Sequence, residues 1–146
     1  MKARLKTKIL IDADAPTVFK YLSHTRYHHL WNTSLQRVDP EGELREGSVY
    51  VSYSLVLGVR TRAVNEVVNF IQNKELQVQN KTGMIQYCVK YELAQRKGAT
   101  SVLCTTIVSS DSRAFAFAKP ILEHLVRREL NVDLNNLKQT VEARLE

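Results

Sequence analysis

The stretch from Ser112 to Glu146 constrains the fold of this chain more than any other segment. It contains one proline and no glycine, and its apolar residues recur at helical spacing. The preceding region, from about Val49 to Val108, runs instead in strand-like segments. A long amphipathic helix that follows a series of strands is typical of a curved sheet wrapped around a helix. The apolar positions of the predicted helix are Ile121, Leu125, Leu130, Leu134, Leu137, Val141 and Leu145.

Length and composition predict one domain, spanning residues 1–146. A chain of 146 residues that is 44% hydrophobic and 25% charged falls in the ordinary range for a globular domain with its own core. No apolar run approaches the roughly 18 residues of a membrane-spanning helix. The charged N-terminus lacks the apolar segment of a signal peptide, so we expect a cytoplasmic protein, either monomeric or homodimeric.

The two cysteines, Cys88 and Cys104, fall on neighbouring predicted strands. Counting back from the turn between these strands places the cysteines near each other but not directly opposite, whereas a disulfide needs Cβ atoms about 4 Å apart. We therefore expect two buried free thiols, as in a reducing compartment. The spacing is not that of a zinc site, and we expect no metal and no cofactor.

Part of the net charge of +6 is concentrated at the N-terminus. At the two-residue period of a strand, four cations share one face there. Such a stripe can contact an anionic membrane surface or form the solvated outer face of a strand, and the latter is the commoner case. Nucleic-acid binding is not expected, because no aromatic side chains alternate with the cations. The four residues are Lys2, Arg4, Lys6 and Lys8.

Alternating apolar residues predict seven strands joined mainly by hairpin turns, which indicates an antiparallel sheet. The turns are marked by glycines, such as those at positions 58, 83 and 98. Along the segment from Val49 to Leu57, the odd-numbered residues are apolar and are expected to face inward. The segment from Val59 to Ile71 is ambiguous, because a β-bulge would change the inward face partway along. The predicted strands cover 3–12, 34–38, 49–57, 59–71, 75–80, 85–93 and 100–110.

Two short helices are predicted after the first strand. Asp14 is suited to cap the first of them, and Pro16 is suited to its first turn. The second, helical or irregular, covers 23–32. The long C-terminal helix is expected to begin near Phe115, and Pro120 can kink it near its start. The predicted architecture is therefore α+β.

These features together resemble the START-related superfamily, whose members share the helix-grip fold. The sequence Asp-Ala-Pro-Thr-Val-Phe-Lys-Tyr-Leu at 14–22 resembles the family's first helix. Trp31 follows this helix at about the spacing at which members of the family often have a tryptophan ahead of the second strand. The segments 44–48 and 64–67 resemble the family's entry to the third strand and one of its mid-sheet strands. The resemblance implies a curved antiparallel sheet of about seven strands around the C-terminal helix, with a cavity between the two.

Strand alternation, combined with this resemblance, indicates which side chains line the implied cavity. Three of them are tyrosines, whose hydroxyls can orient a ligand in an apolar site or simply find partners within a core. The predicted ligand-binding residues are Trp31 at the mouth, Val51, Tyr53, Leu55, Leu76, Val78, Tyr87, Val89 and Tyr91 from the strands, and Phe117, Ile121, Leu122 and Leu125 from the helix.

Other candidate groups are weaker. His24 and His28 stand four apart, as metal ligands on a helix do, but no third ligand is identifiable. A histidine at 28 or 29 can act as a general acid or base at the cavity mouth, although solvated histidines at a helix end are the default. Arg60, Arg62 and Glu66 form either a buried cluster that binds an oxyanion or, more commonly, an exposed strand face.

The resemblance implies two functions from different classes. The first is binding, with or without transport, of a hydrophobic or amphipathic small molecule such as a lipid, quinone, polyketide or isoprenoid. The alternative is an enzyme of the polyketide cyclase/dehydrase type, in which Tyr, His or Arg side chains move protons. No nucleophile elbow, phosphate-binding loop or other catalytic motif in the sequence decides between them.

Overall fold

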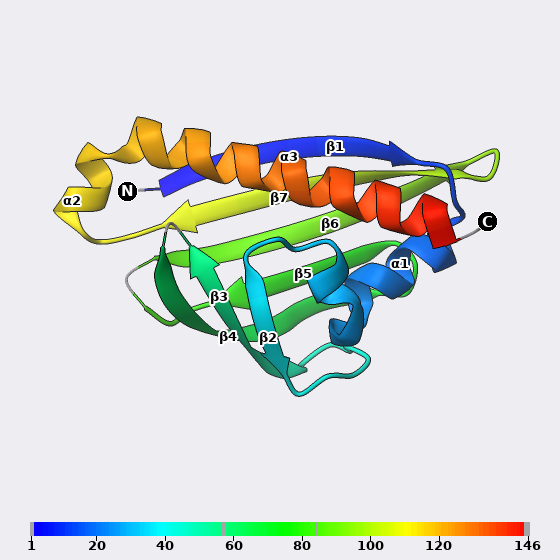
Figure 1. Cartoon of the computed structure of the whole chain (residues 1–146), viewed down its shortest axis with the longest axis horizontal. Helices are drawn as coiled ribbons and strands as arrows, with labels where there is room; N and C mark the ends of the chain where they lie inside the picture. The colour runs from blue at the N-terminus through cyan, green and yellow to red at the C-terminus, as the bar shows by residue number, and fades with distance from the viewer. Residues whose placement is uncertain (1, 57, 84, 145–146) are drawn as a thin grey trace.

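The computed structural model describes residues 2–56, 58–83 and 85–144, so two positions of the predicted apolar pattern, Leu57 and Leu145, lie outside it. Seven antiparallel strands form one sheet in the order β1-β7-β6-β5-β4-β3-β2 (Figure 1). The strands are β1 (Lys2–Ile11), β2 (Leu35–Asp39), β3 (Val49–Val56), β4 (Val59–Ile71), β5 (Glu75–Asn80), β6 (Gln86–Arg96) and β7 (Ala99–Ser109), and the helices are α1 (Ala15–Ser23), the 3-10 helix η1 (Thr25–Leu30), α2 (Arg113–Phe117) and α3 (Lys119–Arg144).

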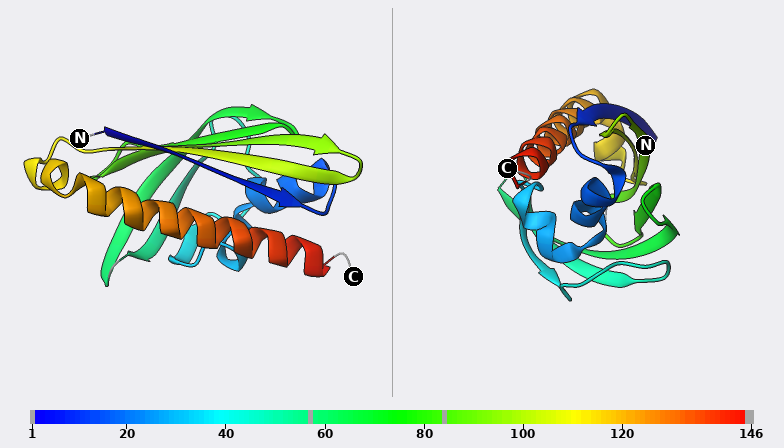
Figure 2. Two further views of the ribbon diagram at one scale, coloured as in Figure 1. Left: turned by 90° about the horizontal axis from the view of Figure 1, so that it is seen from above. Right: turned by 90° about the vertical axis from the view of Figure 1, so that its right-hand side faces the viewer.

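The predicted α+β helix-grip architecture is confirmed. Viewed from its end, the sheet curls into an open trough, and α3 lies along the open side between β1 and the η1–β2 segment (Figure 2). The two short helices α1 and η1 fill one end of this trough, near the C-terminus of α3 (Figures 1 and 2). We call the face of the sheet that is turned toward α3 the inner face.

Turn chemistry sets the register between neighbouring strands. Arg96 pairs with Ala99, so the β6–β7 hairpin has a two-residue loop made of Lys97 and Gly98. Both loop residues have positive φ, of 53° and 81°. Two such residues match the right-handed twist of the flanking strands, and glycine adopts this conformation at no steric cost. The predicted turn at this position is confirmed.

The first strand shows the expected alternation. Ala3, Leu5 and Ile11 are buried on the inner face. The even-numbered residues face outward, so the four N-terminal cations predicted to share a face are exposed together on the outer side of this edge strand. On the neighbouring strands, Cys104 and Cys88 are both free thiols; Cys104 is buried on the inner face as predicted, whereas Cys88 lies on the outer face and is only partly buried.

Strand β3 contradicts the predicted inward face. Tyr50 is buried and pairs with Asn65, whereas Val51, Tyr53 and Leu55 lie on the outer face. The alternation is misleading here because long side chains cover the outer face: the guanidinium carbon of Arg37 lies 4.2 Å from the centre of the Tyr53 ring. Apolar periodicity marks a covered face and does not reveal what covers it.

Strand β4 contains the suspected bulge, between Val67 and Asn69. Before the bulge the odd-numbered residues face inward, and after it Phe70 does, where its ring packs edge-on against Phe19 with centroids 5.3 Å apart. The three charged residues of this strand considered as a buried cluster, at positions 60, 62 and 66, are all exposed on the outer face.

The first helix begins as its sequence predicts. The Asp14 side chain accepts a hydrogen bond of 2.9 Å from the backbone N–H of Thr17, and Pro16 lies in the first turn. This cap satisfies one of the donors that a helix N-terminus leaves free. Val18, Phe19 and Leu22 are then carried into the core.

The C-terminal helix is interrupted at Ala118, which separates α2 from α3, so the single kinked helix predicted from sequence is two helices. Leu134, Leu137 and Val141 are buried in the main core, but no described residue of α3 before Asp133 is buried. The helix therefore packs tightly only with its C-terminal half. No helix in the described residues is long and apolar enough to cross a membrane.

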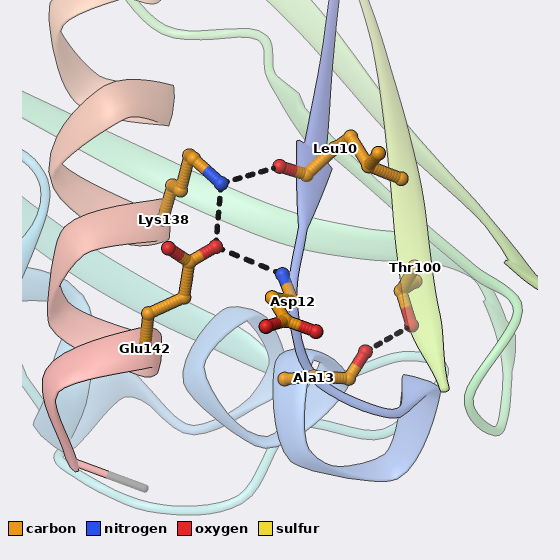
Figure 3. A network of polar contacts seen from close by, with 6 residues as sticks. All are labelled: Leu10, Asp12, Ala13, Thr100, Lys138 and Glu142. Atoms are coloured by element: carbon orange, nitrogen blue, oxygen red, sulfur yellow. Dashed lines mark hydrogen bonds and ion pairs between the residues drawn. The ribbon is translucent and has the colours of Figure 1, made fainter. Parts of the chain in front are cut away.

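Polar contacts fasten that C-terminal half to the end of β1 (Figure 3). Lys138 Nζ donates to the carbonyl of Leu10 over 2.9 Å, and Glu142 Oε2 accepts from the backbone N–H of Asp12 over 2.8 Å. Lys138 and Glu142 also form an ion pair one helical turn apart. These contacts hold α3 in register with the turn that leads into α1.

We predict that Glu142→Gln lowers the melting temperature at pH 7 by roughly 1–3 °C, because partly exposed ion pairs contribute up to about 1 kcal/mol. The Asp12 N–H and Lys138 hold the pKa of Glu142 below its ordinary 4.5. The stabilisation is therefore fully present above pH 4.5 and is lost as the pH falls through the folded pKa. Thermal melts from pH 7 to about pH 3 test this prediction.

The matched control is Glu43→Gln, which removes an exposed partner of Arg45 at 3.9 Å. This control is expected to leave the melting temperature unchanged across the series. Equal effects of the two substitutions would contradict a specific role for Glu142.

Candidate active site or ligand site on the inner face

The inner face opposite the N-terminal half of α3 is apolar but incompletely covered. Tyr87, Val89 and Tyr91 on β6 all retain partial exposure, and so do Leu122 and Leu125 on α3. Apolar side chains that face a neighbouring element yet remain in contact with solvent can bury further surface against a ligand. We call these five residues the open inner surface.

Tyr91 lies at the centre of a group of polar-tipped side chains. It pairs with Cys104 on β7, and the edge of its ring meets that of Trp31 with centroids 6.2 Å apart. Burial raises the pKa of the Tyr91 hydroxyl well above its ordinary value. Electrostatic interactions with Cys104, Tyr50 and Asp133 raise this pKa further, so these three groups lie within electrostatic range of the hydroxyl.

A hydrogen-bonded network at the sheet centre fixes one tyrosine. The Tyr87 hydroxyl donates to Asn65 Oδ1 over 2.6 Å, and Asn65 Nδ2 donates to Ser52 Oγ over 3.0 Å. The hydroxyls of Tyr50 and Tyr91, in contrast, have no hydrogen-bond partner among the described residues. Tyr50 is only 8% exposed, and burial raises its pKa above the ordinary tyrosine value. Two hydroxyls near the centre of the inner face are thus free to bind another group.

Asp133 brings a carboxyl group to the same region. Its Oδ1 accepts hydrogen bonds from the backbone N–H and the hydroxyl of Thr33, at 3.1 and 3.0 Å. Its Oδ2 has no hydrogen-bond partner among the described residues. Burial raises the pKa of Asp133 to about 6, and the Thr33 bonds partly oppose that rise. One carboxylate oxygen is therefore held in place while the other remains available.

One face of α3 connects this carboxyl group to the open inner surface. Asn136 and Thr140 on this face donate to the backbone carbonyls of Trp31 and Leu30, at 3.5 and 3.4 Å. Successive positions three or four residues apart share a helix face. The same face therefore runs from the η1–β2 segment toward the open end of the trough, through Leu122, Leu125, Glu129, Asp133, Asn136 and Thr140.

His28 is a buried core residue and not a solvated histidine at a helix end. Its Nε2 lies 2.7 Å from the carbonyl of Leu22, which can only accept, so Nε2 carries the proton and Nδ1 is bare. Its ring packs edge-on against Trp31 and Tyr50. Burial lowers the pKa of His28 to about 4, so the ring is neutral near pH 7. In the described ranges, no three His, Cys, Asp or Glu side chains gather as metal ligands.

Two small hollows adjoin the open end of the sheet. One, of about 10 Å³, lies between β1, β7 and the start of α3 and includes Leu5, Val108 and Leu122. The other, of about 200 Å³, lies beside Gly83 and Ser109. Neither includes Tyr91 or Asp133, although the first includes Leu122 of the open inner surface, so the polar groups described above lie outside these hollows.

Comparison with known proteins identifies the family of this chain. The family described as polyketide cyclase / dehydrase and lipid transport matches residues 2–142. This chain belongs to that family. None of the curated proteins matches the sequence significantly.

Solved structures related to this family member share its fold at low sequence identity. TTHA0849, a protein from Thermus thermophilus, is 12% identical with a TM-score of 0.85, covering 99% of this chain and 100% of its own. The ZhuI aromatase/cyclase from Streptomyces sp. R1128 is 14% identical with a TM-score of 0.85, covering 100% and 97%. A START superfamily protein from Mycobacterium smegmatis is 14% identical with a TM-score of 0.80, covering 96% and 97%. At these identities the likeness establishes the fold alone.

The sequence predictions for this family member's site divide into three groups. The inward orientation is confirmed for Tyr87, Val89 and Tyr91, and for Leu76 and Val78, which are buried beside them on β5. It is wrong for the three outward residues of β3. It is also wrong for Phe117 and Ile121, which are 93% and 66% exposed. Both lie next to Ala118, where the helix is interrupted between α2 and α3.

Trp31 is not at the mouth of a cavity. It is 5% exposed, and its indole N–H donates to the carbonyl of Tyr21 over 3.0 Å. The sequence interpretation also missed Tyr50, Asn65 and Asp133. Asp133 carried a detectable signal, because it interrupts the apolar stripe between Leu130 and Leu134. Tyr50 and Asn65 carried none, because their orientation depends on the pairing of β3 with β4.

We predict different stability effects for two tyrosine hydroxyls. Tyr87→Phe leaves the Asn65 oxygen without its donor and is expected to lower the free energy of unfolding by about 1–2 kcal/mol. Tyr91→Phe removes a hydroxyl with no partner and is expected to change it by less than about 0.5 kcal/mol. Urea unfolding of both variants tests this difference, and equal losses would contradict the assigned network.

The buried His28 predicts a loss of stability in acid. Its pKa is 6.5 when unfolded and about 4 when folded, so between these values only the unfolded chain gains a proton. The free energy of unfolding is expected to fall by on the order of 3 kcal/mol as the pH drops from about 7 to about 4. His28→Gln is expected to flatten this part of the pH profile, whereas His29→Gln, at an exposed position, is expected to keep it. Urea unfolding at several pH values measures the slopes, and identical slopes in wild type and His28→Gln would refute the prediction.

Proposed function

We propose that this protein binds a hydrophobic or amphipathic small molecule between the inner face of the sheet and the N-terminal half of α3. The observation that carries this proposal is the pairing of an uncovered apolar surface with the two unpartnered hydroxyls of Tyr50 and Tyr91. A core that merely packs covers its apolar surface and pairs its polar atoms. Here both remain open to a further group.

The site has an apolar part and a polar part. Val89, Leu122 and Leu125 supply apolar surface, whose removal from water contributes about 25 cal/mol per Å². The Tyr91 hydroxyl and the free oxygen of Asp133 supply a donor and an acceptor that set the orientation of a polar head. Leu76 and Val78, which are already buried, support the floor and gain nothing further from a ligand.

A second candidate function is catalysis of the cyclase/dehydrase type. It is favoured by Asp133, whose buried carboxyl group has a pKa of about 6 and one free oxygen. Such a group can take a proton near neutral pH, while a tyrosine hydroxyl stabilises a developing enolate by hydrogen bonding. The solved relatives include proteins named as aromatase/cyclases, among them the di-domain StfQ. Loss of turnover in Asp133→Asn, with ligand binding retained, would support this second function.

We predict that native mass spectrometry of freshly purified protein shows a stoichiometric hydrophobic adduct, which organic extraction releases and identifies. Leu125→Glu is expected to abolish the adduct, because a charged side chain would enter the apolar surface. The matched control Asn131→Glu places the same charge at an exposed position of α3 and is expected to keep the adduct.

Both variants must keep the wild-type circular dichroism spectrum for the comparison to hold. An adduct that survives in Leu125→Glu at wild-type occupancy would contradict the proposed site.

A further inference from the structure

The described residues on the inner face of the sheet carry no positive charge. Within the described strands, every Lys and Arg lies on the outer face, in a turn or at a strand end. The inner positions of β6 illustrate the contrast: they carry Tyr87, Val89, Tyr91 and Leu93, while Lys90 lies on the outer side beside Glu75. In a protein of net charge +6, the cations of the described strands thus point away from the inner face.

The charges that do approach this surface are negative. Asp133 is 7% exposed, and Glu129 lies one turn earlier on the same face of α3, near enough to act on it electrostatically. Lys119, toward the start of the helix, forms an ion pair of 3.7 Å with Glu123. His28 is neutral near pH 7 and donates to a backbone carbonyl. Apart from Lys119, which is paired with Glu123, no described side chain at this surface offers a positive charge to an anionic ligand.

We propose that the open inner surface selects its ligand by charge, taking amphiphiles whose polar head donates a hydrogen bond to Asp133 Oδ2 and excluding those with an anionic head. This inference rests on the proposed function and adds the class of head group. An ammonium head is preferred, a hydroxyl head is accepted, and a carboxylate or phosphate head is rejected.

The preference follows from the surroundings of Asp133. A carboxylate with few polar neighbours carries a desolvation cost that an approaching cation offsets and a second anion increases. Thr33 already holds Oδ1, so the carboxyl group is oriented and loses little freedom when a ligand binds. The Tyr50 side chain is 8% exposed and its hydroxyl has no hydrogen-bond partner among the described residues, so it can offer the head group a second polar contact.

Three probes with the same ten-carbon chain test the proposal: decylamine, decanol and decanoate. Calorimetric titration at about pH 7.5, below the micellar concentration, gives the three dissociation constants. The fluorescence of Trp31, the single tryptophan, reports whether binding occurs near Tyr91. Decylamine is expected to bind at least about tenfold more tightly than decanoate, with decanol between them. The ammonium group adds a charge to its hydrogen bond with Asp133, the hydroxyl donates a neutral hydrogen bond, and the carboxylate is repelled.

Asp133→Asn keeps an oxygen that accepts from Thr33 and removes the charge. In this variant the roughly tenfold advantage of decylamine over decanoate is expected to fall to about twofold or less. The matched control is Asp39→Asn, which removes an exposed charge on the outer side of β2 and is expected to keep the wild-type order. The wild-type order alone tests the proposal if Asp133→Asn fails to fold.

The outcomes separate this inference from the function on which it rests. Decanoate binding as tightly as decylamine, with a change in Trp31 fluorescence, would overturn the charge selection and leave the binding function standing. A decylamine preference that survives in Asp133→Asn but not in Asp39→Asn would also overturn it, because the selecting charge would lie outside the site. If none of the probes binds, the proposed function fails and the inference fails with it.

Discussion

The burial of the C-terminal half of α3 is the contact on which the rest of this structure depends. Leu134, Leu137 and Val141 enter the core, where they close the open side of the curled sheet. The contacts of Lys138 and Glu142 then hold the helix against the end of β1. A sheet curled this strongly would leave its inner face in water without such a cover.

The same arrangement explains why the candidate site lies where it does. Packing is complete from Asp133 onward and incomplete before it, so the carboxyl group stands at the boundary between a sealed core and an open surface. It is buried enough for its pKa to rise and exposed enough to keep one oxygen free. Solvated acids lack the first property, and fully enclosed ones lack the second. A position with both is suited to recognition or to proton transfer.

Much of the fold could be predicted from the sequence, because apolar alternation and turn residues indicated the same strand boundaries along most of the sheet. The alternation alone gave the correct inward faces of β1, β5, β6 and β7. The inward face predicted for β3 was wrong because Arg37 covers Tyr53. A covered apolar ring on the outer face produces the same alternation in the sequence as a ring in the core. The site was less predictable, because an unpartnered hydroxyl at Tyr50 depends on pairings that no local pattern contains.

The sheet order has a consequence for how the chain folds. Strand β1 pairs with β7 along its whole length, joining Lys2 to Ser109 and Ile11 to Thr100. Strand β1 must therefore wait until β7 has been translated before it finds its partner. Such distant pairings give a high contact order and slow folding. On the ribosome the N-terminal strand remains an unpaired β-edge for most of that time, and its alternating cations discourage pairing with other chains.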